Sequence, residues 1–278
     1  MIAEAEKGPR LRGTSVHPAA LTRDQVDALY ALLIRHYDDS PRDVFERDLF
    51  EKDNVILIRD ENDGRIAGFS TQMLMRTTVG GEEVAAVFSG DTIIDRACWG
   101  SQELVKSFAR YCGAVEASLE GRPLYWFLIS KGHRTYLYLP LFFREYFPRH
   151  DAPTPAFEQG VLDDVARRKF GACYSPATGL IEFPTSHGQL KPDLALVPKG
   201  REDDPRVRFF VARNPRFAQG SELACIGRLT PSNLRGLCRK PYEEGMRAAL
   251  PQRPESGLGY LAELWGRRAV LLPSWSTP

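Results

Sequence analysis

The stretch VFSGDTIIDRACWGSQELVKSFARY, residues 87–111, has an order of elements that binds phosphate in many proteins. It begins as a strand, passes through a turn at Gly100, and continues as a helix. The first N–H groups of a helix lack internal partners and lie at the positive end of its dipole, so they attract phosphate oxygens. Ser101 can cap this helix, but Trp99 and Gln102 stand where phosphate loops usually carry a basic residue and a second glycine. We therefore expect a phosphate-binding turn of altered composition.

The cysteines and histidines indicate neither a metal centre nor a disulfide framework. The five cysteines are odd in number, far apart and without C-x-x-C spacing: Cys98, Cys112, Cys173, Cys225 and Cys238. His36 and His187 have no metal-type partners at useful spacing. The formal net charge of +1 gives no reason to expect nucleic acid as the main partner. We expect no metal and no nucleic acid.

The chain otherwise has the composition of an ordinary globular protein, with 43% hydrophobic and 26% charged residues among 278. No segment approaches the ~18 consecutive apolar residues that a membrane helix needs. The N-terminal MIAEAEKGPRLRGTSVHP has mixed charges and lacks the apolar core of a secretory signal. We therefore expect a cytoplasmic protein without a membrane span, with one large domain or two modest ones.

Hydrophobic periodicity predicts two helices and then three strands in the first third of the chain. Residues 1–20 look like an N-terminal lead-in. A helix then begins at Thr22, which has Gln25 at capping-box spacing, and a second short helix covers 41–52. Apolar runs separated by the turns ENDG and GGEE predict an antiparallel meander of three strands over 54–60, 65–79 and 84–95.

After the glycine turn the pattern changes to single, longer elements. The apolar face from Leu104 to Val115 predicts a helix, and LYWFLIS, residues 124–130, predicts a strand buried on both faces. The segment 131–148 is expected to be partly helical, with Pro140 starting or interrupting a helix.

The last part of the chain is predicted to hold an insertion, a strand pair and an extension. Residues 151–205 are rich in proline and turn residues, which indicates an insertion with one helix over 156–170. RVRFFVARNP and SELACIGRL read as a strand pair within 206–230. Residues 231–278 form a C-terminal helical extension, in which Pro241 is expected to divide one helix into two pieces.

This order of elements resembles the GCN5-related N-acetyltransferase (GNAT) superfamily, as a divergent member. VAAVFSGDTIIDRACWGSQELVKSFARY looks like that family's acyl-carrier motif, and LYWFLISKGHRTYLYLPLFF looks like its next strand and helix. The likeness covers about 20–148, with 206–230 supplying the last strands. It implies an α/β (α+β) fold, with a central mixed, mostly antiparallel sheet flanked by helices, in an acyltransferase domain over 21–230.

The resemblance also implies a thioester co-substrate, either acyl-CoA or the acyl-phosphopantetheine of an acyl carrier protein. In that family the strand before the glycine turn diverges from the next strand, and the pantetheine arm pairs with its free backbone groups. The residues implied to hold the arm and its phosphates are Gly90, Thr92, Ile93, Ile94, Trp99, Gly100, Ser101, Gln102, Ser130, Lys131 and Arg134. Because Gln102 replaces a family glycine and Glu103 adds a carboxylate, two alternatives remain open. Either a single phosphate uses a smaller cradle, or Lys131, Arg134 or Arg96 hold CoA phosphates elsewhere.

Acyl transfer to an amine needs a base, a polarised thioester carbonyl and a proton for the leaving thiolate. The resemblance implies Asp91 as the base or amine-binding anion and Tyr138 as the acid. The alternatives are a strand-end aspartate held by ordinary partners and a tyrosine that only packs among neighbouring aromatic residues. His133 is the histidine beside the proposed cleft. It is either a base near neutral pH or an idle surface residue.

The leading hypothesis is an acyltransferase that moves an acyl group from a CoA or carrier-protein thioester to a small-molecule amine. The alternative is a non-catalytic ligand-binding or interaction protein on the same scaffold. Residues 151–205 and the chain after 250 are expected to decide the acceptor, by capping the cleft or by forming a homodimer face. The acyltransferase hypothesis requires an open gap between two neighbouring strands just ahead of Gly100.

Overall fold

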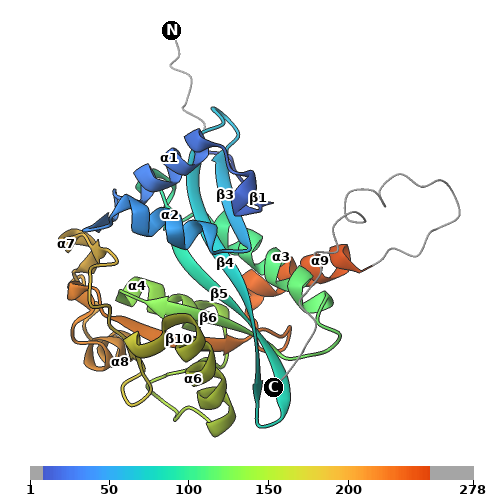
Figure 1. Ribbon diagram of the computed structural model, residues 1–278, viewed down its shortest axis with the longest axis vertical. Helices are drawn as coiled ribbons and strands as arrows, with labels where there is room; N and C mark the ends of the chain where they lie inside the picture. The colour runs from blue at the N-terminus through green and yellow to red at the C-terminus, as the bar shows by residue number, and fades with distance from the viewer. Residues whose placement is uncertain (1–8, 251–278) are drawn as a thin grey trace, which may run out of the picture.

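The computed structural model describes residues 9–250 and centres on an eight-stranded sheet (Figure 1). In spatial order the strands are β1 (Leu11–Val16), β3 (Asn54–Asp60), β4 (Ile66–Val79), β5 (Glu82–Ile94), β6 (Leu124–Ser130), β10 (Glu222–Arg228), β8 (Leu180–Ile181) and β7 (Tyr174–Ser175). Within this sheet β5 and β6 pair in parallel, and the other neighbours pair antiparallel. A second, two-stranded sheet joins β2 (Tyr37–Asp38) to β9 (Gln189–Leu190).

Helices cover both faces of the large sheet. They are α1 (Arg23–Leu33), α2 (Arg42–Phe50), α3 (Glu103–Ala117), α4 (His133–Tyr136), α5 (Tyr138–Phe142), α6 (Ala156–Phe170), α7 (Pro192–Ala195), α8 (Pro205–Arg213) and α9 (Gly236–Ala249). None of these helices is long and apolar enough to cross a membrane. The prediction of a mixed, mostly antiparallel sheet flanked by helices is confirmed.

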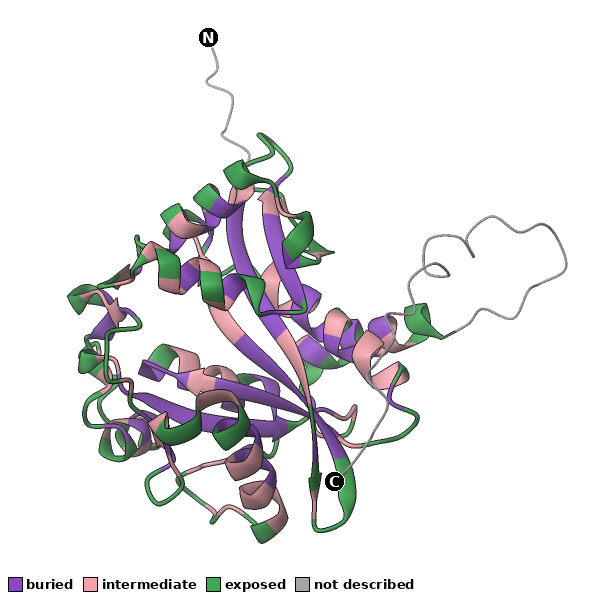
Figure 2. Ribbon diagram, in the orientation of Figure 1, coloured by how far each residue is buried: buried purple, intermediate pink, exposed green. Residues whose placement is uncertain are grey.

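Successive side chains along each strand point to opposite faces of the large sheet, so the core has a cluster on each face. On β5, Ala85 and Val87 pack with α3, α5 and α9, whereas Val84, Ala86 and Phe88 pack with α6. A third cluster joins α1 and α2 to β3 and β4. Strands buried on both faces are nearly continuous apolar runs, and Figure 2 shows the centre of the sheet buried while the outer sides of the helices are exposed.

Local signals located the first helices and the meander well. The Thr22 hydroxyl accepts a hydrogen bond from the Gln25 N–H, and the Gln25 side chain accepts one from the Thr22 N–H. These two hydrogen bonds form the predicted capping box. The strands predicted over 54–60, 65–79 and 84–95 match β3, β4 and β5 within a few residues at their ends.

Four expectations about the fold were wrong. The lead-in contains a strand, because β1 pairs antiparallel with β3 over its whole length. The first strand of the predicted C-terminal pair is helix α8, since Asp204 caps its start and Pro205 occupies the first turn. Residues 151–205 are more than an insertion, because β7 and β8 extend the large sheet.

The fourth error concerns α9, which continues through Pro241 as one helix. It packs closely on α3: a Cβ at Gly113 would lie 2.0 Å from the Tyr242 carbonyl oxygen, and one at Gly245 would lie 2.0 Å from that of Arg110. This helix–helix contact outweighs the backbone hydrogen bond that proline removes. The rest of the predicted extension, 251–278, lies outside the described residues.

Candidate active site

The parallel pairing of β5 with β6 ends in the middle of both strands. It runs from Ala85 opposite Leu124 to Ser89 opposite Leu128. Beyond Ser89, β5 pairs with β4 alone, and there two β5 residues, Gly90 and Asp91, stand against one β4 residue. Such a bulge bends its strand and increases the local twist. The gap expected ahead of the glycine turn is present, and the bulge begins it.

Backbone groups on the last part of β5 face this gap. The Asp95 N–H donates to the Ala67 carbonyl oxygen of the β4 side at 2.8 Å. Because antiparallel residues point alternately toward and away from a neighbour, the peptide groups of Ile94 and Thr92 point away from β4. The Ile94 carbonyl accepts a hydrogen bond from the Trp99 indole at 3.2 Å. The Ile94 N–H and the Thr92 peptide groups therefore offer the hydrogen-bonding edge that an extended ligand can use.

A cavity of about 540 Å³ lies at the gap and reaches both faces of the sheet. We call its part on the first face the α3 compartment, lined by Leu104, Val105, Phe108, Trp126, Tyr138 and Phe142. We call its part on the second face the α6 compartment, lined by Phe88, Lys169, Phe170, Cys173, Phe183 and His187. Asp91 lines the same cavity. Two reactants can thus approach one point from opposite sides of the sheet.

Asp91 is the carboxylate in this cavity that has no hydrogen bond or ion pair within the described chain. The other cavity carboxylates are paired with lysines: Asp48 with Lys52 and Lys169, Glu51 with Lys169, and Glu222 with Lys131. Burial, reinforced by the nearby Asp48 charge, raises the pKa of Asp91 to about 6, against the opposing effect of Lys52 and Lys131. A carboxylate with this pKa can take up a proton near neutral pH.

Tyr138 projects into the cavity from α5. Its ring stacks on Phe142 with ring centroids 5.4 Å apart, which fixes the ring plane against the α3 compartment. Burial raises the pKa of the Tyr138 phenol, so the hydroxyl keeps its proton at neutral pH. A protonated phenol beside a cavity is a proton donor for a leaving group.

Sequence reasoning missed two residues next to Asp91 and Tyr138. The pKa of Tyr37 is raised by burial and by the charges of Asp91 and Glu222, which places these groups together. Lys131 connects the two missed residues: its ammonium lies 3.3 Å from the Glu222 carboxylate and 5.4 Å from the centre of the Tyr37 ring. Glu222 is a buried acid at the start of an otherwise apolar strand, and that contrast was the available signal.

Lys131 lies inside the cavity and not on an outer face. It is 8% exposed, pairs with Glu222 and donates to the His187 carbonyl oxygen at 2.9 Å. Its charge is therefore balanced within the protein. This arrangement suits a residue that shapes the cavity near Asp91 better than one that holds a solvent-facing phosphate.

The glycine turn leaves the start of α3 open. Gly100 has a φ of +93° and no atom within 4 Å of a Cβ built on it, so the turn is uncrowded. The Ser101 hydroxyl accepts from the Glu103 N–H at 3.2 Å. The Glu103 carboxylate turns back to accept from the Gly13 N–H at 3.2 Å and the Ser107 hydroxyl at 3.1 Å. The expected conflict between this carboxylate and phosphate oxygens is thereby reduced.

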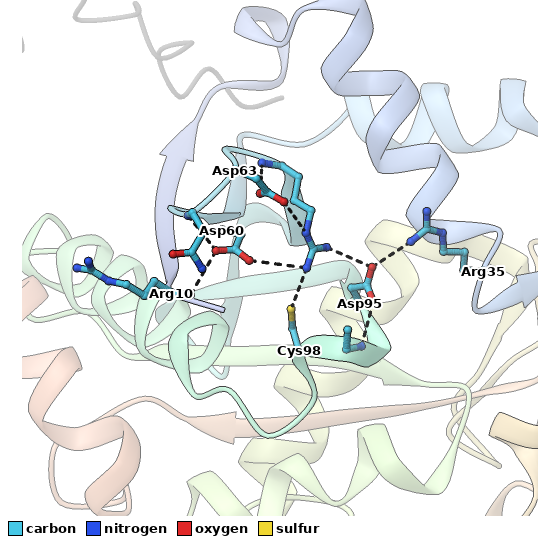
Figure 3. Close-up of polar contacts among 9 residues, drawn as sticks. Arg10, Arg35, Asp60, Asp63, Asp95 and Cys98 are labelled. Atoms are coloured by element: carbon cyan, nitrogen blue, oxygen red, sulfur yellow. Dashed lines mark hydrogen bonds and ion pairs between the residues drawn. The ribbon is translucent and has the colours of Figure 1, made fainter. Parts of the chain in front are cut away.

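A guanidinium network anchors the turn where it leaves β5 (Figure 3). Arg65 lies 3.5 Å from the Asp95 carboxylate and donates to the Cys98 sulfur at 3.8 Å. Arg35 binds the same Asp95 carboxylate at 3.0 Å, and Asp95 also accepts from the Ala97 N–H. These contacts fix both ends of the short 3-10 turn Arg96–Cys98 that precedes Gly100.

Trp99 supports two arginines beside this turn. The Arg96 and Arg134 guanidinium carbons lie 5.7 and 5.4 Å from the Trp99 ring centre, within cation–π range. Arg96 also pairs with Asp193 at 2.6 Å, whereas Arg134 has no carboxylate partner within the described chain. Of the predicted phosphate ligands, Arg134 is thus the one with an uncompensated charge.

Nine predicted site residues do not line the cavity: six lie at the end of β5, in the glycine turn or beside it (Ile94, Trp99, Gly100, Ser101, Gln102 and Arg134), and three are buried elsewhere (Ile93, Ser130 and His133). His133 is 2% exposed, and burial together with Arg134 and Arg201 lowers its pKa, which keeps the ring neutral. Ser130 is fully buried, and Ile93 packs in the cluster under α1 and α2. None of the three lines the cavity. Among the described residues, no group of three His, Cys, Asp or Glu side chains is placed to hold a metal ion.

No protein-family model matches the sequence, and no curated protein matches it either. Comparison with solved structures finds N-acyltransferases. An acyl-CoA N-acyltransferase from Pseudomonas aeruginosa is 19% identical with a TM-score of 0.36, over 48% of this chain and 88% of that one. A GNAT family N-acetyltransferase from Escherichia coli, in complex with CoA, is 17% identical with a TM-score of 0.33, over 50% and 72%. A probable N-acyltransferase from Enterococcus faecalis is 10% identical with a TM-score of 0.35, over 46% of this chain but 31% of that one.

Likenesses of this size carry no conclusion about activity, so the fold rests on the geometry of the chain itself. The mixed, mostly antiparallel sheet and the early divergence of β5 from β6 follow the arrangement expected from the resemblance. The described chain thus has the mixed, mostly antiparallel sheet flanked by helices that the resemblance implied.

Proposed function

We propose that this protein transfers an acyl group from a phosphopantetheine thioester, such as acyl-CoA, to an amine. The observation that carries the proposal is the shared cavity: an unpaired carboxylate, Asp91, and a protonated phenol, Tyr138, line one space where two parallel strands separate. A base and an acid on either side of a passage through a sheet suit a reaction between two substrates.

The α3 compartment is the proposed site of the donor. Its walls are apolar, and the Ile94 N–H and the peptide groups of Thr92 can pair with the amides of an extended pantetheine arm. At the end of the gap, the open start of α3 and the guanidinium of Arg134 provide donors for phosphate oxygens. These groups can bind one or two phosphates. Because both CoA and the phosphopantetheine of a carrier protein meet that condition, both are tested as donors.

In the proposed reaction Asp91 accepts a proton from the acceptor ammonium, which frees the nitrogen lone pair. The amine then attacks the thioester carbonyl, a C–N bond forms and the C–S bond breaks. Tyr138 donates its phenol proton to the departing sulfur, the nitrogen of the new C–N bond loses its second proton through the cavity to restore the phenol, and Asp91 releases its proton to solvent. Lys131 and Glu222 do not react; their paired charges define the electrostatic surroundings of Asp91.

The test combines binding and turnover. We expect CoA and acetyl-CoA to raise the melting temperature, since a ligand that binds only the native state stabilises it. We expect free thiol to appear only when an amine is also present. Phosphopantetheine and a loaded carrier protein are measured in parallel to identify the donor. No thermal shift with any of these thioesters would refute the proposal and favour a different ligand for the cavity.

A further inference from the structure

The α6 compartment has a wall of connected aromatic rings, which we call the ring wall and define as Phe88, Phe170, Phe183 and His187. Its ring centroids follow one another at 5.7 Å from Phe88 to Phe170, 5.9 Å from Phe170 to Phe183, and 3.9 Å from Phe183 to His187. The last pair is stacked, with an interplanar angle of 15°. All four residues line the cavity.

The ring wall is assembled from separate parts of the chain. Phe88 belongs to β5, Phe170 ends α6, and Phe183 and His187 lie between β8 and β9. Three of the four rings thus come from the segment 156–190, which also pairs with β2 through β9. This segment builds the side of the cavity opposite the proposed donor.

The cations near the ring wall are already neutralised. The Lys169 ammonium lies 5.7 Å from the Phe88 ring centre, and its charge is balanced by Asp48 and Glu51. Burial and the Lys131 charge lower the pKa of His187, so its ring is neutral at pH 7. Exposed Arg47 also lines the cavity, which places positive charge where polyamines would be repelled.

The ring wall therefore offers a ligand aromatic faces, and the free carboxylate of Asp91 lines the same cavity. Aromatic walls favour apolar and aromatic bodies, and ring faces attract ammonium groups. Sugars and other polyhydroxy compounds need several hydrogen-bond partners, which the ring wall does not supply.

We infer that the acceptor is a primary amine carried on an aromatic body, which lies along the ring wall while its ammonium group meets Asp91. This inference rests on the proposed acyl transfer and assigns the class of its second substrate. It also assigns Phe183 as a specificity-determining residue, because Phe183 lies between Phe170 and His187 and contacts both rings.

The experiment compares amines of one head group and different bodies. With the full chain and acetyl-CoA, we expect kcat/KM for 2-phenylethylamine to exceed that for ethylamine about 10- to 100-fold, because the ring is buried on binding. Glucosamine and spermidine are expected to react no better than ethylamine. Binding of 2-phenylethylamine is also measured without donor, by calorimetry, which provides a readout besides turnover.

Phe183→Leu tests the assignment of the wall, since leucine stays apolar but removes the ring. We expect KM for 2-phenylethylamine to rise about 5- to 10-fold, with a smaller rise in KM for ethylamine and KM for acetyl-CoA unchanged. Phe50→Leu is the matched control, because Phe50 is an exposed phenylalanine that does not line the cavity.

The possible outcomes distinguish a failure of the inferred acceptor class from a failure of the proposed acyl transfer. Turnover of glucosamine or spermidine as efficient as that of 2-phenylethylamine would overturn the inference and leave acyl transfer intact. An unchanged KM for 2-phenylethylamine in Phe183→Leu would show that the ring wall does not bind the acceptor, and it would also leave acyl transfer intact. If the protein binds acetyl-CoA but no amine releases thiol, the proposed function itself fails.

Discussion

Strand β5 has two halves that differ in their neighbours and in their tasks. Residues 85–89 are paired with β4 on one side and β6 on the other, and their side chains are buried. Residues 90–94 keep only β4, and Gly90, Asp91 and Thr92 line a cavity. The bulge between the halves is the physical cause of the change. A sheet can thus open a site within one strand by ending one ladder early.

The two halves also contribute differently to stability. The paired half buries apolar side chains on both faces and supports the core. The open half places a carboxylate where burial raises its pKa, so ionised Asp91 is a cost to the fold. The comparison leads to predictions for four variants: Asp91 and Val87 test the two halves themselves, and Tyr138 and Gly100 test the cavity and the turn beside the open half.

The largest expected effect is that of Asp91→Asn. Asparagine keeps the size of the side chain but cannot accept a proton, so we expect kcat/KM to fall by at least about 100-fold. In the unsubstituted protein, kcat/KM should fall about tenfold per unit of pH below about 6, as Asp91 becomes protonated. The measurement is a pH profile of amine-dependent thiol release for both proteins.

A stability measurement shows whether Asp91→Asn loses activity without losing the fold. The pKa of Asp91 is about 6 in the folded protein and about 3.9 in an unfolded chain. The folded state therefore binds more protons between these values, and its stability falls as pH rises through them. We expect Asp91→Asn to be more stable than the unsubstituted protein at pH 7, by on the order of 1–3 kcal/mol, with the gain absent below about pH 4. A lower melting temperature at pH 7 would contradict this account.

Tyr138→Phe is expected to have the next largest effect. Phenylalanine keeps the stacking on Phe142 and removes only the hydroxyl, so kcat should fall about 10- to 100-fold with donor KM within about twofold. The measurement is steady-state kinetics with a saturating amine. If the rate is unaltered, Tyr138 is not the acid, and Tyr37→Phe becomes the informative variant because Tyr37 lies near the same charges.

Most of the fold was accessible from local patterns. Alternation and turn letters placed the three antiparallel strands, and the capping box placed the first helix, because these signals depend on residues a few positions apart. The strand β1 was missed since its partner β3 lies about 40 residues away along the chain. Likewise, Pro241 is tolerated inside α9 because of contacts with α3 that no local window contains.

The site was accessible only in part, for the same reason. Asp91 and Tyr138 were chosen from a resemblance, and the structure places both at one cavity; their catalytic roles stay predictions. Tyr37, Glu222 and the ring wall come from five distant segments, so only the folded chain brings them together. His133 was expected beside the cleft, but its ring is buried and does not line the cavity.

Val87→Ala tests the paired half of β5. Val87 is fully buried under α3, and truncation removes two methyl carbons and leaves a small void. We expect the free energy of unfolding to fall by about 2 kcal/mol, with kcat/KM unchanged at a temperature where both proteins are folded. Chemical denaturation measures the first quantity and thiol release the second. A large loss of activity at unchanged stability would show that the two halves are coupled.

The smallest expected effect is that of Gly100→Ala, which tests how far the open half extends. Gly100 has a φ of +93° and free space around it, so alanine adds conformational strain of about 1 kcal/mol but no clash. If the turn holds phosphate, the strain from alanine should displace the turn and weaken CoA binding by a few fold. Calorimetry measures this affinity. Gly121→Ala is the matched control, because Gly121 has a φ of +86° and equally free surroundings but follows the C-terminal end of α3, the opposite end from the glycine turn. The two variants should lose similar stability, and only Gly100→Ala should lose affinity. Equal affinity in both would remove the turn from the site and confine the open half of β5 to the edge formed by Thr92 and Ile94.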